Sequence, residues 1–169
     1  MKLNGKRLSV LREEVLVLPR KGTVNTEDGS ENTEDIVFKF RPVASWDDFY
    51  TLCPAPKPPQ GMVPGGLMKT VDDDPAYIVA MNQHSMLQRK WFVITSIGAT
   101  DGLEFEKVKT GDPTTWGHFD KEMLESGLTP IELAKIYETA YRINTLNDEA
   151  LEEAKKSFLA SLRAPKVSG

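Results

Sequence analysis

The segment 53–69, CPAPKPPQGMVPGGLMK, constrains the fold more strongly than any other part of the chain. It contains five prolines and three glycines. Proline fixes φ and lacks a backbone N–H donor, and glycine is entropically unfavourable inside helices and strands. We therefore expect this segment to be neither helix nor strand, and to form an extended arm or linker over residues 54–73.

Two short strands are expected before this arm. Residues 13–20 form a compact apolar run, and residues 35–43 alternate apolar with polar side chains at the period of two that is typical of strands. The polar, acidic residues 21–35 predict a long exposed hairpin loop. This front part, residues 1–53, ends in a short helix that begins at Ser45, with Asp48 completing a capping box.

Longer helices are expected after the arm. Asp74 and Pro75 predict the start of a helix over residues 74–97, because aspartate caps helix N-termini and proline fits the first position. Its expected apolar stripe is Tyr77, Met81, His84, Leu87, Trp91 and Ile94, widened by Ile78 and Phe92. Residues 103–108 read as a short extended piece.

Three further helices are predicted in the remaining chain. Asp112 and Pro113 predict a helix that ends at Gly127, and Thr129 with Glu132 forms the capping box of the next one. Asn147 caps a last helix that runs to residue 162 and pairs with the preceding one as an antiparallel helical hairpin. The expected fold class is α+β: a small N-terminal antiparallel sheet, then a mainly helical region over residues 74–169, in one compact unit.

Composition excludes several classes of function. The 169 residues carry a net charge of −4, so the clustered basic residues that nucleic-acid binding requires are not expected. No apolar run approaches the ~20 residues that cross a bilayer, and the N-terminus lacks the apolar part of a secretory signal. The single cysteine fits a reducing cytoplasm.

Catalytic and metal-binding patterns are not found in the sequence. The two histidines, His84 and His118, lack zinc-ligand spacing, and His84 falls on the apolar stripe of its helix, where a hydrogen-bonded core histidine is expected. Cys53 has no basic neighbour that would activate it. Among the acids at residues 72–74, Asp74 has a capping role and the other two favour the positive end of the helix dipole. No loop of calcium-ligand spacing surrounds them. We expect neither an enzyme nor a cofactor.

The arm nevertheless carries apolar side chains at Met62, Val63, Leu67 and Met68. An extended proline-rich backbone loses little entropy on docking, so these side chains could bind a groove on a partner. Alternatively, the arm is a connector that covers an apolar patch on the protein's own helices. Both interpretations stay open from the sequence.

The order of these segments resembles tailed-bacteriophage tail assembly chaperones and related small proteins of tail gene clusters. The resemblance rests on the front half, EEVLVLPR … DIVFKFRPV … FYTLCPAPKPP, and on the run from Arg89 onward. That run includes an acid-x-x-Leu/Met-x-x-x-Gly-hydrophobic-Thr/Ser-x-x-Glu element, here from Glu122 to Glu132, and a final helix introduced by Asn-x-Leu. These are capping and packing motifs, and they do not form a catalytic signature.

The resemblance implies a non-enzymatic role in the cytoplasm of a bacterial host. Such chaperones coat the tape-measure protein and recruit tail-tube subunits, which makes these the expected partners, together with possible homo-oligomers. The expected binding residues are those of the arm and, near the C-terminus, Phe158, Leu159 and Leu162. Two alternatives remain: a structural protein of the virion that uses residues 54–70 as an inter-subunit arm, and a small regulatory protein that binds a host enzyme.

Overall fold

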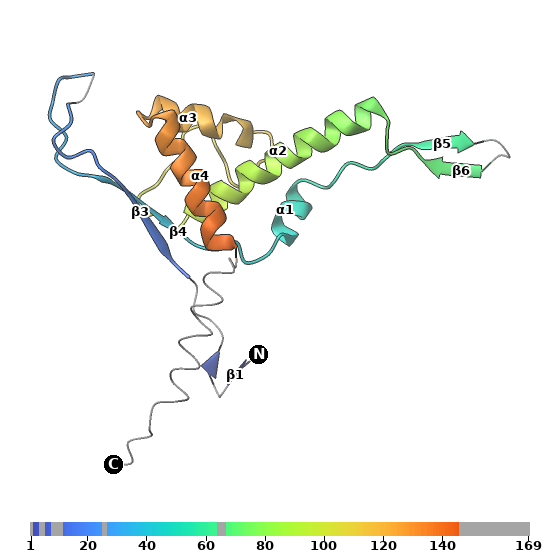
Figure 1. The fold of residues 1–169 in the computed structure, drawn as a ribbon, viewed down its shortest axis with the longest axis horizontal. Helices are drawn as coiled ribbons and strands as arrows, with labels where there is room; N and C mark the ends of the chain where they lie inside the picture. The colour runs from blue at the N-terminus through green and yellow to red at the C-terminus, as the bar shows by residue number, and fades with distance from the viewer. Residues whose placement is uncertain (1, 4–5, 8–11, 25–26, 64–66, 146–169) are drawn as a thin grey trace, which may run out of the picture.

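The computed structural model describes residues 2–3, 6–7, 12–24, 27–63 and 67–145 (Figure 1). The strands lie in three separate two-stranded antiparallel sheets. The elements, in chain order, are β1 (Lys2–Leu3), β2 (Lys6–Arg7), β3 (Glu14–Leu18), β4 (Ile36–Phe40), α1 (Asp47–Leu52), β5 (Gln60–Val63), β6 (Leu67–Thr70), α2 (Pro75–Ile97), the 3₁₀ turn η1 (Trp116–His118), α3 (Phe119–Glu125) and α4 (Pro130–Asn144). The predicted α+β class is confirmed.

The β3–β4 hairpin presents one face to the core. Its register pairs Leu16 with Phe38 and Leu18 with Ile36, and Leu18 and Phe38 are buried. Alternate positions along the strands, such as Val17, are exposed, as the period of two requires. The connecting loop is an exposed hairpin as predicted, and one backbone bridge joins Val24 to Glu31 within it.

The start of α1 differs from the prediction. Trp46 occupies the N-cap position and gives no side-chain capping bond. Ser45 Oγ instead accepts the N–H of Asp47 at 3.0 Å, which is a turn within the loop. The capping box predicted for Ser45 and Asp48 is therefore wrong.

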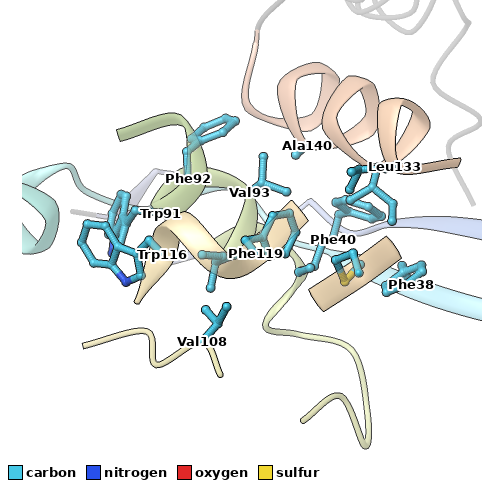
Figure 2. Close-up of a cluster of buried hydrophobic side chains, with 14 of the residues drawn as sticks. Phe38, Phe40, Trp91, Phe92, Val93, Val108, Trp116, Phe119, Leu133 and Ala140 are labelled. Carbon is cyan, nitrogen blue, oxygen red and sulfur yellow. The ribbon is translucent and has the colours of Figure 1, made fainter. Parts of the chain in front are cut away.

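One hydrophobic core joins the hairpin to the helices. In Figure 2, side chains from β4, α2, α3 and α4 converge, with Phe40 and Phe119 inside the cluster. Phe49 of α1 and Trp116 of η1 are also fully buried. Because the front of the chain and the helical region share this cluster, neither has a separate core among the described residues.

The two halves of α2 have different surroundings. From Trp91 to Ile97 nearly every side chain is buried, including Val93 and Ile97, which the predicted stripe did not include. From Pro75 to Lys90 only His84 is buried. Ile78, predicted on the core stripe, is exposed instead, because the helix extends beyond the body at this point (Figure 1).

The caps of α2 and α4 are as predicted. The Asp74 side chain accepts the N–H of Tyr77 at 2.9 Å, with Pro75 in the first turn. At α4, Thr129 and Glu132 form the complete capping box. The expected last helix, from Asn147 to residue 162, and the helical hairpin it would complete lie outside the described residues.

One prediction between α2 and α4 is wrong: Asp112 does not begin a helix. Residues 103–108, predicted as a short extended piece, form no strand and bend at residues 106 and 107. The Asp112 carboxylate accepts the backbone N–H and hydroxyl of Thr114, and the indole of Trp116 donates to the carbonyls of Lys109 and Thr110. These bonds hold a turn, so helical structure starts only at η1.

The prediction that residues 53–69 contain no strand is also wrong. β5 and β6 pair in antiparallel register, with Met62 opposite Met68 and Val63 opposite Leu67. Four of the five prolines precede β5, and the fifth, Pro64, falls between the two strands. The strands themselves contain no proline, which leaves their ladder hydrogen bonds available.

Candidate protein-binding surface

A projecting limb is the most distinctive external feature of the molecule. We define the limb as residues 60–63 and 67–88, which comprise β5, β6 and the N-terminal part of α2. From His84 onward this part of α2 already contacts the body. Figure 1 shows the β5–β6 hairpin at its tip, well separated from the helices of the body. The hairpin therefore does not cover a patch on the helices of the body, and the connector interpretation is wrong for this part of the arm.

The limb exposes large apolar side chains. Met62 is 78% exposed, and on α2 Ile78 is 46%, Val79 is 55% and Met86 is 61% exposed. Single exposed apolar residues are normal on a protein surface. These side chains instead gather on one slender projection, which is typical of a surface that contacts another macromolecule.

The limb helix also lacks charge. No charged residue occurs between Pro75 and Gln88, although most of these positions are exposed. An exposed helix ordinarily carries charged residues on its solvent face. A neutral helix costs little to desolvate, so this segment is suited to burial against a partner.

Methionine is concentrated in the same place. Four of the six methionines lie in the limb, namely Met62, Met68, Met81 and Met86. The unbranched, polarizable methionine side chain adapts to irregular apolar surfaces and is frequent in surfaces that accept varied partners.

The root of the limb is fixed to the body by a polar cluster. Lys90 forms an ion pair with Asp120 of α3, and its ammonium lies 2.7 Å from the hydroxyl of Tyr137 on α4. Tyr137 in turn donates to Asp120 at 2.7 Å, and burial, followed by this carboxylate, raises the pKa of the Tyr137 hydroxyl. The cluster ties α2 to both later helices where the limb begins.

A second contact lies on the α1 side of the root. The ring of His84 packs 5.1 Å from that of Phe49, and its Nε2–H donates to the carbonyl oxygen of Cys53 at 3.0 Å. His84 is thus a buried, hydrogen-bonded histidine, as predicted. Burial raises the pKa of the Cys53 thiol, which disfavours the reactive thiolate.

The described ranges hold neither a metal-binding cluster nor a helix suited to cross a membrane. There, no group of three or more histidine, cysteine or acidic side chains is arranged to hold a metal ion. No helix within those ranges combines the length and apolar character needed to cross a membrane. Among the described residues, the limb is therefore the candidate functional surface.

The sequence located part of this surface. Met62, Val63, Leu67 and Met68 all lie on the β5–β6 hairpin. Phe158, Leu159 and Leu162 lie outside the described residues. The exposed residues of the α2 half were missed, although the absence of charge over residues 75–88 was a readable signal.

Comparisons with protein-family models, with curated proteins and with solved structures find no significant match.

Proposed function

We propose that the chain is a non-enzymatic assembly protein of a tailed bacteriophage, acting in the cytoplasm of the host as a tail assembly chaperone. The observation that carries this proposal is the limb, with an exposed, uncharged helix face bearing Ile78, Val79 and Met86. The resemblance in segment order to tail assembly chaperones supports the choice of system.

The chemistry of the limb fits an apolar helical partner. A helix with one apolar face buries that face readily against another uncharged helix, through contacts spaced three and four residues apart. The tape-measure protein, as a long helical chain with apolar stripes, has this character, and tail-tube subunits are the second expected partner. The limb would shield such a stripe until the tube is built around it.

A structural virion protein is the second candidate function. It is favoured by the position of the β5–β6 hairpin, which projects from the body with Met62 exposed and does not fold back on it. A hairpin presented in this way could add to a neighbouring subunit by contacts along its strands.

Co-expression with the tape-measure protein tests the proposal. Under the chaperone proposal, the full chain keeps that protein soluble and is retained with it in a pull-down, but is missing from purified particles by mass spectrometry. A fixed copy number in the particle would contradict this role and support the structural one.

A matched pair of variants tests whether the partner binds to the limb. The variant Ile78→Ser with Met86→Ser should lose retention of the partner, because both side chains are on the limb. Ile131→Ser, which alters a 75% exposed apolar residue on α4, is the control and should bind normally. Equal loss in both variants would mean that the limb is not the binding surface.

A further inference from the structure

We propose that the limb binds a second copy of this chain, through antiparallel pairing of the exposed halves of two α2 helices about a two-fold axis at Asn82. This inference goes beyond the proposed function and does not depend on it. It rests on the order of apolar, polar and charged residues along one face of α2.

The exposed face of the α2 half has a seven-residue repeat. At 100° per residue its members fall within an arc of about 100° on the helix. They are Pro75, Ile78, Val79, Asn82, Met86 and Arg89. Pro75, Asn82 and Arg89 are spaced seven apart, and Val79 and Met86 repeat the same spacing. A spacing of seven keeps these residues on one side of the helix, as pairing with a second helix requires.

The repeat is self-complementary in the antiparallel direction. When Asn82 of one copy faces Asn82 of the other, residues whose numbers sum to 164 lie opposite each other. Ile78 then faces Met86 of the second copy, and Met86 faces its Ile78, so these two apolar side chains pair with each other. Val79 faces Ser85 beside them. A contact of this kind, in which the same surface serves both copies, is what two-fold symmetry requires.

The charged residues at the two ends of this α2 face also favour the antiparallel alignment. The acidic residues Asp72 and Asp73 are exposed at the start of α2, and Arg89 is exposed at the end of the uncharged stretch. Over the described residues, none of these three takes part in an ion pair. In the antiparallel pair, Arg89 lies beside Asp73 of the second copy.

The parallel alignment is disfavoured by the same charges. It would place the acidic cluster of one copy beside that of the other, and Arg89 beside Arg89, with no compensating opposite charge. A polar Asn82 at the centre of an otherwise apolar contact also fixes the register, since only the aligned pair lets the two amides bond each other.

The expected dimer is weak and depends on concentration and salt. The helix from Pro75 to Arg89 is about 22 Å long, so the contact is smaller than the ~1,600 Å² of a standard stable interface. Its end charges are exposed, and salt screens them. The dimer would cover the same helix face that the proposed partner needs, so partner and second copy would compete for it.

Charge reversal tests the pairing on the full chain by sedimentation equilibrium. Arg89→Glu and Asp73→Lys, made singly, should each weaken the dimer about tenfold or more, because each change acts at both ends. The combined variant restores opposite charges and should return the dissociation constant to within about threefold of the parent. Failure of the combined variant to recover would overturn the proposal, as would a parent chain that stays monomeric at millimolar concentration.

Disulfide formation tests the register independently, in a Cys53→Ala background. Asn82→Cys places two thiols at the two-fold axis and should give a covalent dimer under mild oxidation. Ala76→Cys is the matched control: Ala76 is exposed on the same helix, about 120° around from Asn82, and should link poorly. Equal linking by both variants, or linking only by the control, would overturn the proposed pairing.

Discussion

Arg20 and Glu132 join the β3–β4 hairpin to the first turn of α4 by a two-point ion pair. The second of its bonds, from Nη2 of Arg20 to Oε2 of Glu132, is 2.7 Å long, and both side chains are mostly buried. The same carboxylate accepts the backbone N–H of Thr129 at 2.8 Å. The Glu132 carboxylate thus completes the N-terminal cap of α4 and also binds Arg20, which lies just after β3 and 112 residues earlier in the chain.

Replacing Glu132 should destabilise the protein strongly. Glu132→Ala removes half of the capping box and leaves the guanidinium of Arg20 without its carboxylate, so the free energy of unfolding should fall by about 1–3 kcal/mol. Denaturant titration measures the change. The control is Glu138→Ala on the same helix, where an exposed pair with Lys135 is lost and a change within about 0.5 kcal/mol is expected. Similar losses in both variants would contradict this role for Glu132.

The same ion pair makes stability depend on pH in the acid range. Arg20, together with bonds from Thr129, lowers the pKa of Glu132 to about 2. Because the folded-state pKa lies below the unfolded value of about 4.3, this stabilisation is complete above that value and is lost as the pH falls toward 2. Unfolding free energies measured from pH 5 to pH 2 should fall less steeply for Glu132→Gln than for the parent. Parallel curves would show that Glu132 does not contribute.

Glu122 is expected to hold the irregular segment 106–108. Its carboxylate accepts the backbone N–H groups of Glu106, Lys107 and Val108, the last two at 3.1 Å. Glu122→Ala should cost about 1–3 kcal/mol, because the buried N–H of Val108 and the part-buried N–H groups of Glu106 and Lys107 lose their acceptor. Amide exchange at these three residues should accelerate first. Glu125→Ala, which removes only exposed ion pairs, is the control. Unchanged exchange at the three amides in Glu122→Ala would refute the assignment.

The two halves of α2 should differ in stability. Ile78→Ala, on the limb, should change the free energy of unfolding by less than about 1 kcal/mol, whereas Ile94→Ala, fully buried in the core, should cost about 2–5 kcal/mol. Native-state hydrogen exchange supplies a second measurement: amides of residues 79–83 should exchange by local opening, and those of residues 92–97 only by global unfolding. A uniform protection pattern would contradict this division.

Short sequence motifs predicted the start of a helix correctly where the capping hydrogen bonds form within the first turn of that helix. Thr129 with Glu132, and Asp74 with Pro75, need only their own neighbours, and both caps form as expected. Asp112 and Pro113 carry a similar signal, but the indole of Trp116 bonds backward to Lys109 and fixes a turn there. This competing bond depends on the burial of Trp116 in the core, which no local pattern shows.

The strands and the surface of the limb were harder to infer. The prediction for residues 53–69 rested on the total number of prolines in the segment. It overlooked two short runs without proline, which pair as β5 and β6. The helical pattern of α2 could not show where the body ends, so Ile78 was placed in the core although it is exposed. Periodicity defines the faces of a helix, but only packing decides how far along its length a face is covered.

The root of the limb gives the protein the properties of a lever. α2 runs without a break from the core to Pro75, and the contacts of Lys90 and His84 hold it where it leaves the body. From His84 to Pro75 the helix is about 14 Å long, so a tilt of about 10° moves its N-terminal end by about 2 Å. A load on the exposed part of α2 is therefore transmitted to α1 through His84, and to α3 and α4 through Lys90.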